Sequence, residues 1–245
     1  TIYNRFFIKE QFFMAKSLLD VFFPPVCICC GARISEAGML CSECYGRLRF
    51  IEAPFCRICG RPLQISDDDA VCTECRAGKK AFETARSAFV YGDIVKDLVL
   101  SLKYGDKTDL AFWMARMMVN AGRDILDGAD MLVCVPLHPL RLLDRKYNQS
   151  ALLAENISKL SGVPFSPFVL KRVKRTAKQG HFSRNERYSN LTGAFDFFKS
   201  AETARTYVLI DDVMTSGATA EYCARALKRG GAREVRVLTF ARAVR

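Results

Sequence analysis

The sequence lacks a long uninterrupted apolar segment. Residues 1–26 are rich in phenylalanine, but charged side chains interrupt every apolar run there, namely Arg5, Lys9, Glu10, Lys16 and Asp20. A membrane-spanning helix needs about 20 consecutive apolar residues, so the sequence predicts no membrane insertion. A secretory signal peptide is not expected either, because its unbroken apolar region and small-residue cleavage site are missing. These absences predict a reducing, cytoplasmic setting.

Histidine and acidic residues are also scarce. His138 and His181 are the only histidines, and a histidine in a loop more often contacts phosphate or solvent than acts as a base. Residues 1–84 carry 11 basic and 10 acidic residues, whereas residues 85–245 carry 26 basic and 16 acidic residues, a net charge of +10. A surplus of this size favours polyphosphate ligands or nucleic acid.

The phenylalanine-rich segment 1–26 predicts an amphipathic helix that Pro24 and Pro25 end. We expect its apolar side to pack against the core of the protein. A membrane-surface or partner-binding helix is the alternative, which the weakly basic polar side disfavours. The residues of the apolar side are Phe6, Phe7, Phe12, Phe13, Leu18, Leu19 and Phe22.

Nine of the eleven cysteines lie within residues 27–75, where a pattern of two C-x2-C pairs occurs twice. Ten residues separate the pairs in the first copy and twelve in the second, which is the spacing of a tetrahedral Cys₄ zinc site. Four C-x2-C pairs outside a βαβ unit argue against redox chemistry, and the compartment argues against disulfides. The sequence predicts two structural zinc ions held by Cys27, Cys30, Cys41, Cys44, Cys56, Cys59, Cys72 and Cys75.

The pairing within the two cysteine sets is left open by the spacing. Sequential pairing is the default, and a crossed pairing remains possible. Cys29 falls outside both sets. Because so small a module depends on its metal ions, replacing Cys59 or Cys75 is expected to unfold it and to leave the C-terminal domain folded.

The most informative stretch of the C-terminal part is residues 207–231. Residues 207–210 form an aliphatic run that is typical of a strand buried in a parallel sheet, and Asp211 and Asp212 follow directly. A turn of small residues opens a helix over about residues 219–229, which Gly230 and Gly231 end. The turn consists of Thr215, Ser216, Gly217, Ala218 and Thr219.

Such a turn is an anion site, because backbone N–H groups and hydroxyls meet there at the positive end of a helix dipole. Carboxylates beside a phosphate would repel it, so we expect Asp211 and Asp212 to face sugar hydroxyls or a hydrated Mg²⁺. The plainer alternative is an N-capped helix after a strand. Asp212 is expected to face solvent, so that removing its charge costs little stability.

Further strands are predicted at residues 88–91, 131–135 and 193–197, and helices at 94–104, 110–121 and 150–161. This alternation predicts an α/β fold with a parallel sheet flanked by helices. The junction after residue 135 is expected at the same sheet edge as the acidic pair. Its residues Pro136, Leu137, His138, Arg141, Arg145 and Lys146 would bring positive charge to a second phosphate, unless they form a solvated loop.

Residues 171–187 hold seven basic residues and one acidic residue. A segment of this charge repels itself, so we expect it to be poorly ordered without an anion. A disordered basic surface without function is the equally weighted alternative. The basic residues are Lys171, Arg172, Lys174, Arg175, Lys178, Arg184 and Arg187.

These blocks, taken in order, resemble the ComF/GntX family of competence-associated proteins. The resemblance rests on the paired cysteine motifs, on residues 136–139 with residues 148–150, and on the block formed by Thr176, Gln179, Arg187, Asn190 and residues 193–195. It also rests on residues 208–219, which match the 5-phosphoribosyl 1-pyrophosphate (PRPP) motif. It implies a small Cys₄ double zinc ribbon at residues 27–84 before a type I phosphoribosyltransferase domain at residues 85–245.

The resemblance also implies roles for the site residues. Asp211 and Asp212 would hold the ribose diol and Mg²⁺, residues 215–219 the 5-phosphate and residues 136–138 the pyrophosphate, while residues 171–187 would close over the site. The protein would be a PRPP-dependent transferase of undefined acceptor, acting in DNA uptake or nucleotide-linked metabolism. The alternative is a non-catalytic factor that handles single-stranded DNA, together with DNA-uptake proteins, and retains the ligand site.

Overall fold

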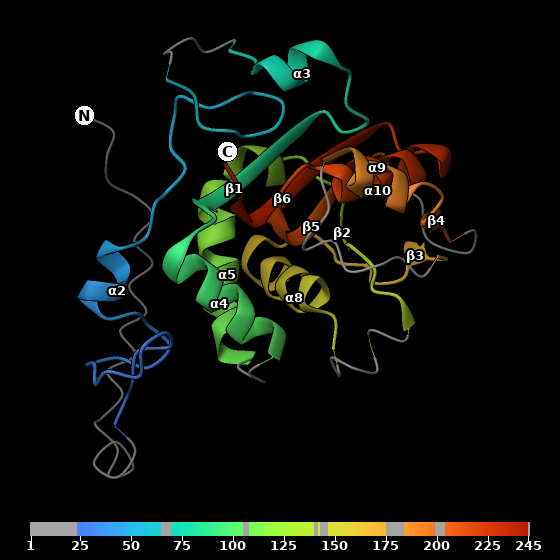
Figure 1. Ribbon diagram of the computed structural model, residues 1–245. Coiled ribbons are helices and arrows are strands. Elements are labelled where there is room, and N and C mark those ends of the chain that lie inside the picture. The colour runs from blue at the N-terminus through green and yellow to red at the C-terminus, as the bar shows by residue number, and fades with distance from the viewer. Residues whose placement is uncertain are drawn as a thin grey trace, which may run out of the picture.

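The computed structural model describes residues 24–64, 70–104, 108–139, 142, 147–174, 184–198 and 204–244 (Figure 1). The predicted N-terminal helix lies almost entirely outside these residues. No helix in the described part of the chain is both long and apolar enough to cross a membrane.

The centre of the fold is a four-stranded sheet in the order β1-β6-β5-β2, and every pair of neighbours is parallel. Its strands are β1 (Thr84–Val90), β2 (Met131–Cys134), β5 (Thr206–Met214) and β6 (Glu234–Arg242). All four residues of β2 are buried, as are residues 207–210 of β5. This burial on both faces explains why both strands are aliphatic runs.

Helices cover both faces of the sheet, so the fold has three layers (Figure 1). One face is covered by α4 (Asp93–Tyr104), α5 (Thr108–Ala121), α6 (Arg123–Leu126) and α8 (Gln149–Ser161). Leu98, Met114 and Ile157 from these helices share a core with Val208 and Phe240 of the sheet. On the other face, α10 (Ala218–Arg229) buries Cys223 and Leu227 against β5 and β6. The α/β class with a parallel sheet flanked by helices is confirmed.

A second, two-stranded antiparallel sheet packs against α10. It consists of β3 (Leu170–Arg172) and β4 (Phe195–Phe197), and α9 (Arg184–Leu191) lies between them in the sequence. A Cβ on Gly230 would lie only 2.3 Å from ring atoms of Phe197. Only glycine at this position therefore lets the end of α10 come this close to the sheet. Parts of the basic segment 171–187 therefore have regular structure.

Three features differ from the sequence prediction. Strand β1 begins at Thr84, four residues earlier than expected. Strand β6 was not predicted at all, although it joins β1 to β5 in the sheet. Strand β5 continues through the acidic pair to Met214, because β6 keeps pairing with it beyond Ile210, the partner of the last β2 residue, Cys134.

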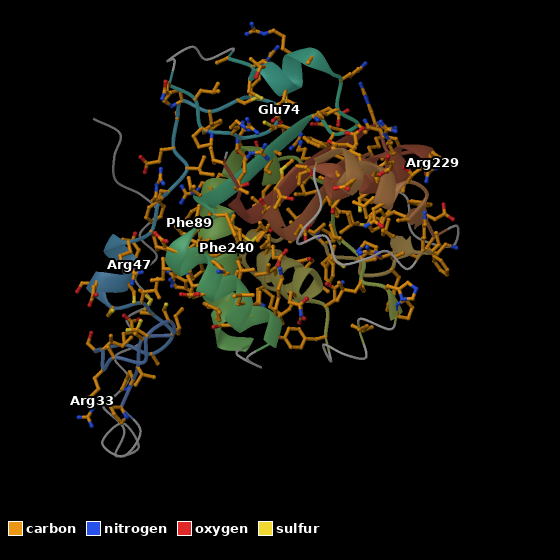
Figure 2. The ribbon with its side chains drawn as sticks, viewed as in Figure 1. Arg33, Arg47, Glu74, Phe89, Arg229 and Phe240 are labelled. Carbon is orange, nitrogen blue, oxygen red and sulfur yellow. The ribbon has the colours of Figure 1, made fainter. Side chains whose placement is uncertain are left out.

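The N-terminal part adds two short helices, α2 (Ser42–Gly46) and α3 (Thr73–Ala77), each inside one cysteine set. We call residues 27–44 the first cysteine module and residues 56–75 the second. The two helices lie at different sides of the sheet domain, with α2 near α4 and α3 above β1 (Figure 1). Figure 2 likewise shows Arg33 of the first module far from Glu74 of the second.

The segment between the two modules covers the outer edge of β1. Its backbone pairs with β1 through Ile51 N–H to Ala88 C=O at 2.9 Å and Val90 N–H to Arg49 C=O at 2.8 Å. The Phe50 ring also contacts the Phe89 ring in a tilted arrangement, with centroids 4.8 Å apart. The Phe89 ring in turn contacts Phe240 at a centroid distance of 5.1 Å (Figure 2). The edge of the sheet is thus closed by the protein's own chain.

Candidate functional site

The acidic pair lies where β2 stops and β5 continues. Asp211 is the first residue of β5 beyond the last β2 pair, Cys134 with Ile210. Its Oδ1 accepts hydrogen bonds from the Ser150 hydroxyl and the Asp212 N–H, both at 2.9 Å. Burial raises the pKa of Asp211 to about 7, and the neighbouring charge of Asp212 adds to this effect. At neutral pH a fraction of the Asp211 carboxyl groups is therefore protonated.

Ser150 is held in this position by the N-terminus of α8. Asn148 is the N-cap, and its side-chain oxygen accepts the Ser150 N–H at 3.0 Å, while its amide donates to the Val135 carbonyl at 3.1 Å. One asparagine therefore fixes both the end of β2 and the start of α8. The segment 148–150 was part of the sequence motif, but its contact with Asp211 was not predicted.

The expectation that Asp212 faces solvent is wrong. Asp212 is 8% exposed, its Oδ1 accepts the Val213 N–H at 2.8 Å, and its Oδ2 forms an ion pair with the ammonium of Lys103. Lys103 comes from the last turn of α4. No sequence pattern distinguished Lys103, because a lysine at the end of an amphipathic helix is usually a solvated residue. Tertiary packing alone brings it to the acidic pair.

The small-residue turn follows β5 directly and leads into α10. Gly217 is the N-cap of α10 with φ 77°, a left-handed conformation that favours glycine, and a Cβ there would lie 3.0 Å from the Met214 side chain. The Ser216 hydroxyl accepts the Ala218 N–H at 3.4 Å. A small pocket of about 20 Å³ is lined by residues of the turn and by Asp211. The structure thus brings the turn and one predicted carboxylate into one pocket.

The segment after β2 is described only in part. Pro136 is buried, Leu137 and His138 are half-buried, and the His138 carbonyl accepts the Leu142 N–H at 3.1 Å. Arg141, Arg145 and Lys146 lie outside the described residues. Directly after them, the Tyr147 hydroxyl donates to the Leu102 carbonyl at the end of α4. This bond ties the segment to the helix that carries Lys103.

The basic segment divides into residues with different surroundings. The half-buried Arg172 places its guanidinium over the Phe195 ring at 5.2 Å. Lys171 and Lys174 are exposed, and Lys171 lies 3.8 Å from an Asp196 oxygen. Arg175 and Lys178 lie outside the described residues, and Arg184 and Arg187 fall in α9. The predicted disorder of this segment concerns mainly residues that the structure does not describe.

A chain of contacts connects the turn to the linker before β1. The Tyr188 hydroxyl of α9 donates to the Ser216 carbonyl at 3.4 Å, and the Lys80 ammonium donates to the same hydroxyl at 3.4 Å. One residue further, the Ala81 N–H donates to the buried Glu221 carboxylate of α10 at 2.9 Å. Apart from Ser216, none of these residues was predicted as a site residue, because each contact joins distant parts of the sequence.

The cysteines form two tetrads in sequential order, Cys27, Cys30, Cys41 and Cys44, and Cys56, Cys59, Cys72 and Cys75. In each tetrad all four sulfur atoms lie within 4.8 Å of one another. Cys30 and Cys41 are 3.7 Å apart, as are Cys59 and Cys72. Zinc–sulfur bonds of roughly 2.3 Å in a tetrahedron require sulfurs about 3.8 Å apart, so both tetrads fit zinc. With four thiolates each, they leave no open position and are structural sites.

The second tetrad has a buried cation beside it. All four of its cysteines are buried, and Nη2 of Arg242 donates to Cys59 Sγ at 3.4 Å. Arg242 is 2% exposed and lies at the end of β6, opposite Met214 of β5. Four thiolates around Zn²⁺ carry a net charge of −2, which a nearby guanidinium partly balances. The second module is thereby linked to the strand that borders the acidic pair.

The architecture and the site define a class of protein. It is an α/β protein with a parallel sheet flanked by helices, preceded by a part with two Cys₄ sites of the zinc-ribbon type. The double zinc ribbon domain family matches residues 18–76, which include both tetrads.

Comparison with known proteins places the chain more closely. The chain is 30% identical over 208 residues to the DNA utilization protein YhgH of Salmonella typhimurium, covering 83% of this chain and 90% of the relative. It is 29% identical over 230 residues to competence protein F of Haemophilus influenzae, covering 91% and 99%. The chain belongs to the ComF/GntX family.

Among solved structures, the chain is similar to the glutamine phosphoribosylpyrophosphate amidotransferase of B. subtilis complexed with ADP and GMP. The TM-score is 0.38 and the identity 17%, over 57% of this chain. The chain spans 30% of the length of that enzyme.

Proposed function

We propose that this protein binds PRPP together with Mg²⁺ at the edge of the sheet where β5 meets α10. The supporting observation is that Asp211 and four residues of the turn, Thr215, Gly217, Ala218 and Thr219, line one pocket at the start of a twelve-residue helix. The N–H groups of the turn suit the 5-phosphate, and the carboxylates suit the vicinal hydroxyls of ribose. A ligand with both features at the right separation is a ribose 5-phosphate derivative.

The proposed reaction is displacement at C1 of the ribose. The bond from C1 to the pyrophosphate oxygen breaks, pyrophosphate leaves with the electron pair, and an acceptor supplies the pair for the new bond. Bound Mg²⁺ would neutralise charge on the departing pyrophosphate, with Asp211 and Asp212 as its candidate ligands. The protein's own part is to fix the ribose by its diol and its 5-phosphate while C1 carries positive charge.

The binding proposal is tested by calorimetric titration of PRPP with Mg²⁺. Asp212→Asn removes a charged acceptor for the diol, and a charge-assisted hydrogen bond contributes roughly 1.5–3 kcal/mol, so affinity should fall by about one to two orders of magnitude. The double variant Asp211→Asn/Asp212→Asn should not bind. Circular dichroism must show that it is folded, because Asp212 is buried.

Asp130→Asn is the matched control. Asp130 accepts the Arg205 and Thr206 N–H groups before the opposite end of β5, so the same substitution there should leave PRPP affinity unchanged. Wild-type affinity in the folded double variant would refute the PRPP site. For wild type, a screen of acceptors for pyrophosphate release then tests whether the site turns over.

The relatives are named for competence and for DNA utilization. We propose that this protein acts in DNA uptake or DNA utilization and that it does so in the cytoplasm. A factor that binds single-stranded DNA without turnover is the second candidate. Lys171 and Lys174 are exposed, and the Lys171 ammonium lies 5.7 Å from the centre of the Phe198 ring. Phe168 and Phe198 are 75% and 43% exposed, so cations and exposed aromatic rings occur together in and next to β3 and β4. Single-stranded DNA binds to such surfaces by phosphate contacts and base stacking.

The DNA candidate has its own test. Affinity for single-stranded DNA should fall with salt by a logarithmic slope of roughly 0.7 per phosphate contact. Lys171→Ala/Lys174→Ala should reduce this slope, whereas Arg172, which packs on Phe195, is a poor choice. If Asp211→Asn/Asp212→Asn abolishes PRPP binding but leaves DNA binding and DNA uptake in cells intact, the ligand site is vestigial. Loss of uptake with DNA binding intact would favour the enzyme.

A further inference from the structure

The ion pair between Lys103 and Asp212 is an unusual feature of the candidate site. Both side chains are largely buried: 21% of the Lys103 side chain and 12% of the Asp212 side chain are exposed. Within the described residues, Asp212 Oδ2 has no hydrogen-bond partner in addition to this pairing. Removing two charges from water is costly, and their attraction offsets the cost only with good additional hydrogen bonds. Among the described residues, Asp212 Oδ2 therefore has the Lys103 ammonium as its neighbour and no hydrogen bond in addition.

The position of Lys103 is fixed from two sides. Its helix α4 ends next to the segment that follows β2, since the Tyr147 hydroxyl donates to the carbonyl of Leu102. Its ammonium lies on the acidic pair, where its charge also lowers the pKa of Asp211 against the larger effect of burial. Lys103 thus contacts the acidic pair from a helix whose last turn is joined to Tyr147, the residue directly after the segment assigned to the pyrophosphate.

The chemistry of lysine would allow Lys103 to leave the Asp212 carboxylate and bind a phosphate group instead. Its ammonium is a compact charge with three donors on a flexible four-carbon chain, and lysine commonly binds phosphate as such a point charge. Vicinal hydroxyls of a bound ribose can donate hydrogen bonds to Asp212 Oδ2. The lysine is then available for a group with higher negative charge than a carboxylate.

We propose that Lys103 binds the pyrophosphate group of PRPP and rests on Asp212 only while the site is empty. This assignment rests on the proposed function and makes it more specific. It gives the site a means to distinguish PRPP from ribose 5-phosphate, because only a ligand with pyrophosphate at C1 engages the lysine. It also places a positive charge where the leaving group accumulates negative charge.

The test compares two ligands in two variants. Lys103→Met keeps the apolar part of the side chain and removes the charge, and Lys96→Met, at an exposed position of α4, is the control. In titrations with Mg²⁺, Lys103→Met should lower PRPP affinity by about 10- to 100-fold and ribose 5-phosphate affinity by less than about 3-fold. Lys96→Met should change neither affinity.

Other outcomes would refute the role of Lys103 in pyrophosphate binding or the proposed PRPP site itself. Equal losses for both ligands would mean that Lys103 only positions Asp212, and unchanged affinity for PRPP would mean that it does not contact the ligand. A wild-type protein that binds neither ligand would overturn the proposed function itself, and the assignment with it.

A second variant pair covers the case in which Lys103→Met does not fold. Removing both charges of a buried pair is far less harmful than removing one, so Lys103→Met/Asp212→Asn is compared with Asp212→Asn alone. The lysine substitution should again weaken PRPP selectively over ribose 5-phosphate. Equal weakening of both ligands in this background would also overturn the assignment.

Discussion

The two cysteine modules share one sequence pattern but have different surroundings. In the first, Cys30 is exposed and Cys41 half-buried, and only Cys27 and Cys44 enter the core near α4. In the second, all four cysteines are buried, and Arg242 from the sheet reaches Cys59. Local spacing therefore defines the metal site, whereas tertiary packing decides whether that site is buried against the sheet of the C-terminal domain.

Two equivalent glycines show the same difference in burial between the two modules. Gly31 and Gly60 are equivalent in the two sequence repeats, and both have positive φ, 76° and 65°. Around Gly31 a Cβ would meet nothing within 4 Å, but at Gly60 it would lie 2.6 Å from the carbonyl oxygen of Ala85. Close to it, Arg86 donates to the Arg57 carbonyl at 3.2 Å and lies over the Phe55 ring at 4.5 Å. The second module thus packs directly on β1.

The largest expected effect is that of Cys59→Ser. It breaks the second tetrad and leaves the buried Arg242 without its thiolate, and loss of one partner of a buried pair costs roughly 3–5 kcal/mol. Calorimetry should show a lower unfolding temperature for the whole chain, including the C-terminal domain. The contact with Arg242 is why we no longer expect that domain to be unaffected.

Cys30→Ser tests whether the exposed first tetrad contributes less to the stability of the chain than the buried second tetrad. It should reduce the zinc content from two ions to one, measured by metal analysis, with little change in the main unfolding transition. If the two serine variants unfold alike, the difference in burial between the tetrads has no energetic consequence.

A smaller effect is expected from Arg242→Met. Side chains that contact metal ligands typically change metal affinity by about 10- to 100-fold when they are replaced. Competition with a chelator should therefore remove zinc from the second tetrad more readily than in wild type, while the first tetrad is unchanged. Arg33→Met, in the exposed part of the first module, is the control. Equal zinc retention in wild type and Arg242→Met would show that the guanidinium does not stabilise the metal site.

The smallest expected effect is the difference between Gly60→Ala and Gly31→Ala. Both variants pay the conformational cost of positive φ, roughly 1–2 kcal/mol, so this cost cancels in the comparison. Gly60→Ala adds a clash with the Ala85 carbonyl, and overpacking of this kind costs typically 1–3 kcal/mol. Denaturant unfolding should show the additional loss only at Gly60. Equal losses would place the second module away from β1.

The sequence was most informative where function depends on neighbouring residues. Strand, carboxylates, turn and helix follow one another within residues 207–229, so β5 and α10 could be predicted together. The tetrads were predictable for the same reason, since each ligand pair is formed by one tight turn. Local geometry determines both patterns.

The missed features all depend on distant contacts. Ser150 and Asp211 are 61 residues apart, and Arg242 and Cys59 are 183 apart. Lys103 and Tyr188 have no local pattern that distinguishes them from surface residues. Asp212 was expected in solvent because it follows an apolar run, but β5 continues past it with β6 alongside, and α4 supplies its counter-charge. Only the assembled fold defines these partners.

Hydrogen–deuterium exchange with and without PRPP and Mg²⁺ tests the central claim most directly. We expect the backbone amides of residues 211–219 to exchange more slowly with ligand, because the phosphate takes over the N–H groups of the turn. Exchange in the first cysteine module should be unchanged. Unchanged exchange at residues 211–219, with protection in the first module or elsewhere, would contradict the claim that the ligand binds where β5 meets α10.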